Sequence, residues 1–219
     1  MAEAIKSFFI DGPAGRLEAL LNAGAADARY AALVTHPHPL FGGTIHNKVV
    51  YHAAKALGSF GFPVLRFNFR GAGLSHGTHD GRAEVEDVRA ALHWLMNEFG
   101  LPIVFAGFSF GASTGLRACC PESRVPLLIS LGTPVAAEGR VYQYKFLAEC
   151  DKPKLFVSGD HDQFGPVPEL ERVLAHAADP KKLVIIPNAD HFFEGQLAMM
   201  RKAIESWMAE QLGLTPEME

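Results

Sequence analysis

The chain has 219 residues, 48% of them hydrophobic and 20% charged, and this length and composition predict one globular domain over residues 1–219. The formal net charge is −4, from 20 Lys and Arg against 24 Asp and Glu, which disfavours nucleic acid or an anionic membrane as the main partner. No apolar run approaches the roughly 20 residues of a membrane-spanning helix, so no membrane span is expected.

The three cysteines, Cys119, Cys120 and Cys150, are an odd number in a chain too large to depend on disulfides. Their spacing matches neither a redox C-x-x-C motif nor a zinc site. The first seven residues have no basic region followed by a long apolar core, so a secretory signal is not expected. These features predict a cytoplasmic protein whose thiols stay reduced and serve packing.

In chain order, residues 8–10 and 17–21 flank a turn that contains Gly and Pro, and they predict an N-terminal hairpin. Strands and helices then alternate. Short apolar runs predict buried strands at residues 31–35, 64–69, 103–106, 127–131, 155–158 and 183–186. Apolar residues at helical spacing predict helices over 85–99 and 193–207. The alternation predicts an α/β fold, with a mostly parallel central sheet and helices on both faces.

The connection between residues 131 and 154 is short. One helix is expected in it, near residues 141–149. This leaves no room for a large lid over the carboxyl ends of the strands.

The sequence Gly107-Phe108-Ser109-Phe110-Gly111 follows the buried-strand run 102–106 and precedes a helical stretch, 112–120. A strand, a sharp turn and a helix are the context in which G-x-S-x-G forms a nucleophile elbow. Glycines are needed there because side chains at those positions would collide with neighbouring backbone. The pattern predicts that Ser109 is a nucleophile and that the amide of Phe110 faces a developing oxyanion.

An acid and a base follow in the chain order that this arrangement needs. The strand-like run 154–158 ends in Gly159, followed by Asp160 and Asp162, either of which could be the acid. The run 183–186 is followed closely by His191. Since ligands of open α/β sheets bind beyond the carboxyl ends of the strands, these residues are expected at one edge of the sheet.

On these residues the chain resembles the α/β-hydrolase superfamily, and within it the small, lidless serine esterases that are similar to dienelactone hydrolase. The resemblance covers nearly the whole chain, including the hairpin, the elbow, the two loops and the segments 35–43 and 67–71. In such families the acid lies in a G-x-x-D turn, which corresponds to Gly159 and Asp162. The resemblance therefore implies a triad of Ser109, Asp162 and His191. Dienelactone hydrolases proper have Cys where this chain has Ser109, so their lactone substrate is not carried over.

The second oxyanion donor of the superfamily usually comes from the loop after the third strand, here residues 36–40. Pro37 and Pro39 have no N–H group, so only His38 and Leu40 can donate from this turn. The resemblance favours His38 and leaves Leu40 as the alternative. The family commonly has Gly where this chain has Pro37.

This constellation predicts hydrolysis of carboxylic esters of small soluble substrates through an acyl-serine intermediate, without a cofactor or metal. Thioesters and activated amides share the mechanism, and a non-catalytic interaction protein on the same scaffold is a second hypothesis. Metal chemistry is disfavoured because H-E-x-x-H and comparable ligand spacings do not occur. Aromatic residues near the predicted site are expected to line a substrate pocket: Phe41, Phe108, Phe164 and Phe192.

Overall fold

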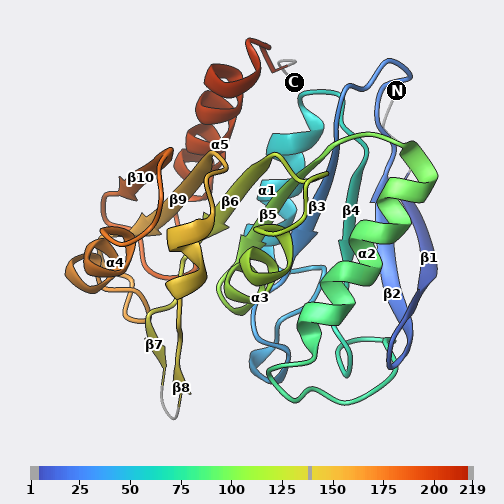
Figure 1. Cartoon of the computed structure of the whole chain (residues 1–219), viewed down its shortest axis with the longest axis horizontal. Coiled ribbons are helices and arrows are strands. Elements are labelled where there is room, and N and C mark those ends of the chain that lie inside the picture. The colour runs from blue at the N-terminus through green and yellow to red at the C-terminus, as the bar shows by residue number, and fades with distance from the viewer. Residues whose placement is uncertain (1–4, 138–139, 217–219) are drawn as a thin grey trace.

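The computed structural model describes residues 5–137 and 140–216 (Figure 1). Its centre is an eight-stranded sheet in the order β1-β2-β4-β3-β5-β6-β9-β10. The strands are β1 (Ile5–Gly12), β2 (Gly15–Asn22), β3 (Ala31–Thr35), β4 (Val64–Phe67), β5 (Ile103–Phe108), β6 (Leu127–Leu131), β9 (Lys154–Gly159) and β10 (Lys181–Ile186). The hairpin β1–β2 and the pair β2–β4 are antiparallel, and every pairing from β4 to β10 is parallel.

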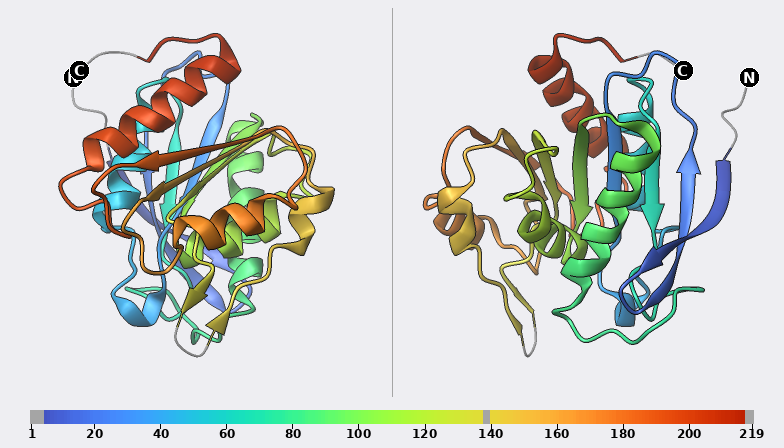
Figure 2. Two further views of the ribbon diagram at one scale, coloured as in Figure 1. Left: turned by 90° about the vertical axis from the view of Figure 1, so that its left-hand side faces the viewer. Right: turned by 45° about the vertical axis from the view of Figure 1, so that its right-hand side comes forward.

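Helices cover both faces of the sheet (Figure 2). The pair α1 (Lys48–Gly58) and α5 (Leu197–Leu212) covers one face, and α2 (Glu84–Phe99), α3 (Phe110–Cys119) and α4 (Val167–Leu174) cover the other. Each layer encloses its own apolar core, because the central strands are buried on both sides. The predicted fold class, the hairpin and the helices on both faces are confirmed.

The predicted helix over residues 141–149 is wrong in its first half. Arg140–Val141 forms strand β8, which pairs with β7 (Ala136–Ala137), and only Lys145–Glu149 forms a short 3-10 helix, η2. A β-branched and aromatic run favours extended backbone here. The hydroxyl of Tyr144 then donates to the carbonyl of Pro134 at 2.7 Å and fastens the returning chain to the end of β6.

Two other predicted elements differ at their ends. The run in β10 was expected to be fully buried, but Leu183, Val184 and Ile185 are only half buried because β10 is an edge strand of the sheet. The last helix begins at Leu197 and not at Phe193. Phe193 has a φ of 54° and its side chain is fully buried, so the chain turns at this residue before the helix begins.

Among the described residues, no helix is both long and apolar enough to cross a membrane. The three cysteines are free thiols. Cys119 and Cys150 are buried in the core below α2–α4 and Cys120 packs against it, as predicted for packing residues.

Candidate active site

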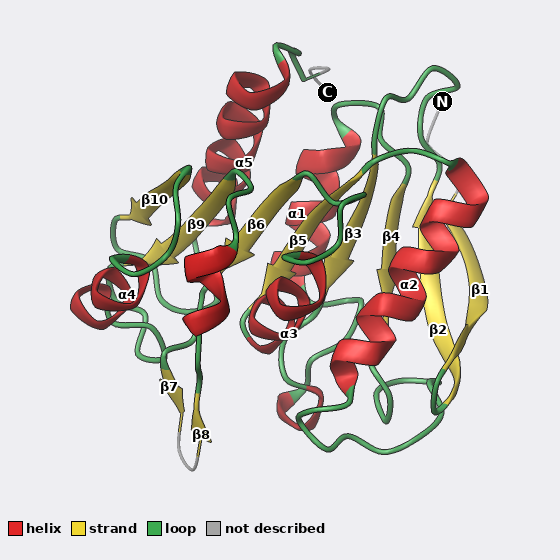
Figure 3. Ribbon diagram, viewed as in Figure 1, coloured by secondary structure: helices red, strands yellow, loops and turns green. Residues whose placement is uncertain are grey.

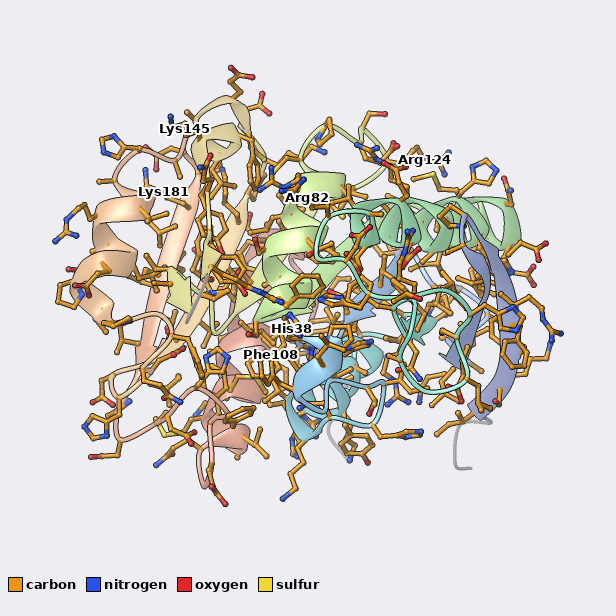
Figure 4. The ribbon with its side chains drawn as sticks, turned by 90° about the horizontal axis from the view of Figure 1, so that it is seen from below. His38, Arg82, Phe108, Arg124, Lys145 and Lys181 are labelled. Carbon is orange, nitrogen blue, oxygen red and sulfur yellow. The ribbon has the colours of Figure 1, made fainter. Side chains whose placement is uncertain are left out.

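The parallel strands all point toward one edge of the molecule, the lower edge in Figure 1, and the loops that follow them gather there (Figure 3). Ser109 follows β5, Asp162 follows β9 and His191 follows β10. His38 follows β3. Figure 4 looks onto this edge, and His38 and Phe108 lie near the middle of the view. The topology therefore brings the predicted site residues to one place, as expected of a parallel sheet.

Ser109 has the strained backbone that a nucleophile elbow requires, with a φ of 54° and a ψ of −120°. The turn is so tight that a Cβ on Gly107 would approach the Cα of Ala112 to 2.7 Å, and one on Gly111 would overlap the carbonyl oxygen of His36. The glycines are thus needed because the backbones approach so closely, which is why glycine is expected at both positions. Helix α3 begins immediately after Ser109.

A continuous chain of contacts joins the serine, the histidine and the acid. His191 Nε2 lies 2.9 Å from Ser109 Oγ, and His191 Nδ1 lies 2.9 Å from each carboxylate oxygen of Asp162. His191 and Asp162 are both 2% exposed, whereas Ser109 is half buried and lines a cavity. The arrangement has the geometry of a serine nucleophile with a base and an orienting carboxylate.

Asp162 is held by its own turn. Its Oδ1 accepts hydrogen bonds from the backbone N–H groups of Phe164 and Gly165 at 2.9 and 3.1 Å, and Ser158 Oγ donates to Oδ2 at 3.3 Å. Asp162, and not Asp160, therefore accepts the backbone N–H groups of this turn.

Asp160 instead joins the acid loop to the histidine loop. Its Oδ1 accepts from the N–H of Ala189 at 3.3 Å, and its own N–H donates to the carbonyl of Ile186 at 3.2 Å. The N–H of His161 donates to the carbonyl of Ala189 at 3.0 Å. The loop that carries Asp162 and the loop that carries His191 are thus hydrogen-bonded to each other.

Three phenylalanine rings surround the imidazole of His191, at centroid distances of 5.0 Å for Phe108, 4.7 Å for Phe164 and 5.3 Å for Phe192. Phe164 and Phe192 line the cavity that contains Ser109. The prediction for Phe108 is wrong. Phe108 is fully buried, because it is the last residue of β5 and its side chain lies in the core below His191.

The two predicted oxyanion donors are neighbours. The rings of His38 and Phe110 lie 5.1 Å apart, and neither of their backbone N–H groups has an acceptor among the described residues. The N–H of Leu40, the alternative donor, is engaged with His38 Nδ1 at 3.2 Å. This favours His38 over Leu40, because a donor for an oxyanion must face the site without another acceptor.

His38 is also the first member of a side-chain cluster with His79 and Glu84, which the sequence did not reveal. His38 Nε2 lies 3.2 Å from His79 Nε2, and His79 Nδ1 lies 2.7 Å from the fully buried Glu84 Oε1. Burial, Arg140 and His79 lower the pKa of His38 to about 4, so its imidazole is neutral near pH 7.

His36, two residues before His38, connects the same loop to the turn after β4. Its Nδ1 donates to the carbonyl of Pro37 at 2.6 Å, and its Nε2 accepts from the N–H of Phe69 at 2.9 Å. Because His36 is fully buried, its pKa is lowered to about 3. Arg70, the residue after Phe69, forms an ion pair with the buried Asp87 of α2, with 2.6 Å between Arg70 Nη2 and Asp87 Oδ1.

Ser109 and His191 line a cavity of about 310 Å³. Phe41, which is 81% exposed, also lines this cavity, and Leu40 does not. Further lining residues were not predicted from the sequence: Pro37, Asn47, Pro134, Arg140 and Tyr142. Three of these, Pro134, Arg140 and Tyr142, come from the region of β7 and β8, whose position over the site depends on the pairing of these two short strands.

In the described residues between β6 and β9, the chain contains the pair β7–β8 and the short helix η2. Neither has the size of a lid, which agrees with the prediction from the short connection. Within residues 5–137 and 140–216, no group of three or more His, Cys, Asp or Glu side chains is arranged to hold a metal ion.

Comparison with known proteins gives consistent matches. Residues 41–210 match a family model described as alpha/beta hydrolase domain. An uncharacterized protein of Rickettsia prowazekii is 34% identical over 208 residues, which cover 91% of this chain and 87% of that protein.

Two solved structures are similar over nearly their whole length. An alpha-beta serine hydrolase homologue from Coxiella burnetii is 37% identical with a TM-score of 0.84, and the match covers 91% of this chain and 95% of that one. A serine hydrolase without a lid from Xanthomonas campestris is 32% identical with a TM-score of 0.83, and the match covers 97% of each chain.

Proposed function

The chain belongs to the family of alpha/beta hydrolase domains and has the fold of that family, and we propose on this premise that it is a serine hydrolase that cleaves carboxylic esters of small soluble substrates. Ser109 is the nucleophile, His191 the general base and acid, and Asp162 the residue that orients and stabilises the imidazole. The observation that carries the proposal is the unbroken chain of 2.9 Å contacts from Ser109 through His191 to Asp162.

The mechanism follows from these positions. Ser109 Oγ attacks the ester carbonyl carbon while His191 Nε2 takes the hydroxyl proton, and the same proton then goes to the departing alkoxide. The C–O bond to the alcohol breaks as the bond to Oγ persists, which leaves an acyl-serine. Water, deprotonated by His191, attacks this acyl group and releases the acid with the serine restored.

Two backbone N–H groups are suited to the oxyanion of the tetrahedral intermediate, those of His38 and Phe110. Each such donor contributes on the order of 3 kcal/mol to transition-state stabilisation in comparable sites. The positive end of the α3 dipole, immediately after Ser109, acts in the same direction.

The decisive experiment replaces the nucleophile. Ser109→Ala should lower kcat for p-nitrophenyl butyrate by about 10³ or more and should abolish labelling by a fluorophosphonate, which needs a serine activated by a base. Ser7→Ala removes an equivalent hydroxyl from an exposed position on β1 and serves as the matched control. Near wild-type turnover in Ser109→Ala would refute the assignment.

The same probe tests the alternative, a non-catalytic interaction protein. A chain that only uses the scaffold would not react with a fluorophosphonate even when Ser109 is present. Thioesters and activated amides would enter through the same acyl-serine, so side-by-side kcat/KM values for butyrate esters, thioesters and anilides decide the preferred leaving group.

A further inference from the structure

A second and larger hollow lies beside the catalytic cavity. It is a groove of about 670 Å³ between α2, α3 and β8, and Phe110 lies in its wall. Three arginines line it, Arg82, Arg117 and Arg140. Figure 4 shows Arg82 on the same lower face of the molecule as His38. We call this hollow the arginine groove.

The groove has an excess of positive charge. Asp80 is the one carboxylate among its lining residues, and it is occupied by its own turn, where Oδ1 accepts from the N–H groups of Ala83 and Arg82. Among residues 5–137 and 140–216, no carboxylate lies within ion-pair distance of the three guanidinium groups. The charge that faces the groove is therefore available to a ligand.

Two of the arginines have defined positions. Arg117 Nη2 donates to the carbonyl of Gln143 at 3.2 Å, and its guanidinium lies over the ring of Phe146. Arg140 lies beside the hydroxyl of Tyr142, where its charge opposes the rise in pKa that burial gives the phenol. A guanidinium that is already held loses less conformational entropy when it binds an anion.

The arginine groove joins the catalytic cavity. Arg140 and Tyr142 line both hollows, and the charge of Arg140 reaches His38, whose pKa it helps to lower. A molecule whose scissile carbonyl lies at Ser109 can therefore extend past Arg140 toward Arg82 and Arg117.

From this geometry we propose that the arginine groove binds an anionic part of the substrate, and that the preferred substrates are esters or thioesters that carry phosphate groups. The proposal rests on the proposed hydrolase function and adds a substrate class to it. Guanidinium groups bind phosphate and carboxylate oxygens through paired, charge-assisted hydrogen bonds. Three arginines in a groove of this volume match more than one anionic group, which favours a polyphosphorylated substituent over a single carboxylate.

The chemical step is unchanged by this substituent. The acyl group passes from the substrate oxygen or sulfur to Ser109 Oγ, His191 supplies the proton to the departing alkoxide or thiolate, and water then releases the acid. The anionic substituent takes no part in bond making. It lowers the KM by holding the substrate along the groove.

The test uses matched substrates that differ in charge. Butyryl-coenzyme A and butyryl-N-acetylcysteamine share the acyl group and the sulfur leaving atom, and only the first carries phosphates. Mono-p-nitrophenyl glutarate and p-nitrophenyl butyrate differ in a carboxylate on the acyl side. For each pair, we take the ratio of kcat/KM for the charged substrate to kcat/KM for the neutral one. This ratio measures the contribution of the arginine groove, because a loss of catalytic activity that affects both substrates equally cancels.

Wild-type protein should prefer butyryl-coenzyme A over its neutral partner. Arg82→Gln and Arg117→Gln should each lower that ratio about tenfold through KM, and Arg82→Glu should lower it further. Arg172→Gln, which removes an exposed positive charge on α4 outside the groove, should leave the ratio unchanged. Added NaCl should reduce the wild-type ratio, because salt screens exposed charges.

The outcomes separate the proposals. A preference confined to the glutarate ester that depends on the arginines would place the anion on the acyl side and overturn the phosphate assignment. Equal ratios in wild type and the arginine variants would overturn the arginine groove altogether. If no ester or thioester is turned over, the hydrolase proposal fails. In that case calorimetric binding of coenzyme A to Ser109→Ala, with and without Arg82→Glu, still decides whether the groove binds phosphates.

Discussion

The rings of His38 and His79 meet with their Nε2 atoms 3.2 Å apart, although 41 residues separate them in the chain. The N–H of Leu40 donates to His38 Nδ1, so in the neutral imidazole the proton of His38 is on Nε2 and points to His79. On the other side of the ring, His79 Nδ1 lies 2.7 Å from Glu84 Oε1. These contacts join the loop that holds a proposed oxyanion donor to the first turn of α2.

His79→Phe should slow turnover by disturbing that loop. We expect kcat for p-nitrophenyl butyrate to fall about tenfold with little change in KM, a smaller loss than the 10²–10³ that follows removal of an oxyanion donor. His79→Gln, whose side-chain oxygen can still accept from His38 Nε2, should recover most of the rate. Steady-state kinetics on the two variants check this. An equal fall in kcat in both variants would show that the contact with His38 Nε2 does not contribute to the rate.

Asp162→Asn and Asp160→Asn should have different effects. Asp162 contacts His191 directly, so its replacement should lower kcat by roughly 10³ or more with a folded protein. Asp160 bonds the backbone of the neighbouring loop, so its replacement should act mainly on the melting temperature. Measuring kcat and the melting temperature of both variants side by side checks the assignment, and a reversed pattern would make Asp160 the acid.

Acid should destabilise the fold through His36. Its pKa is about 3 in the folded chain, against about 6.5 for an unperturbed histidine, so the unfolded chain binds an extra proton once the pH falls below about 6.5. Stability is therefore full at neutral pH and is lost as the pH falls toward 3. Between pH 7 and pH 5 this residue alone should cost about 2 kcal/mol of the free energy of unfolding.

The control for this effect is His36→Gln, whose amide can replace both hydrogen bonds of the ring but does not titrate. Urea unfolding at pH 7 and pH 5 should show a smaller pH dependence in His36→Gln than in wild type. The same dependence in both proteins would mean that another group takes up the proton.

Short soluble esters should be better substrates than long emulsified ones. The described residues between β6 and β9 form only the pair β7–β8 and the short helix η2, neither of which has the size of a lid, so we expect an open site. Rates for p-nitrophenyl esters of increasing chain length, measured through their solubility limits, check this. A jump in rate above the solubility limit would show interfacial activation and contradict an open site.

Local pattern was enough to predict the strands, because a short apolar run bounded by turn residues is typical of a strand in a parallel sheet. The elbow could be predicted for the same reason. Its glycines, its serine and the helix that follows are consecutive in the chain, and the strain at Ser109 is a property of that one turn. The rule that ligands bind beyond the strand ends predicts that Asp160, Asp162 and His191 lie at this edge, and the choice of Asp162 over Asp160 depends on the family resemblance.

Contacts between distant segments could not be predicted in this way. His79 and Glu84 lie in and after a polar loop that gives no periodic signal, and their meeting with His38 depends on how α2 packs against the sheet. Arg140 reaches the site because β7 and β8 pair, where a helix was expected. Adjacency to Ser109 predicts Phe108 in the pocket, but successive residues of a strand point to opposite faces, so Phe108 lies in the core.

The hydrogen bonds between the acid loop and the histidine loop limit how the positions of these two loops can change relative to each other. Because Asp160 and His161 bind the backbone of Ile186 and Ala189, a shift of the edge strand β10 carries Asp162 and His191 together. Their mutual distance is then conserved, while the distance from His191 to Ser109, which belongs to β5, takes up the change. In a chimera of this protein and a relative, residues 159–165 and 187–193 should therefore come from the same protein. If the two loops came from different proteins, we expect the acid and the base to be misaligned.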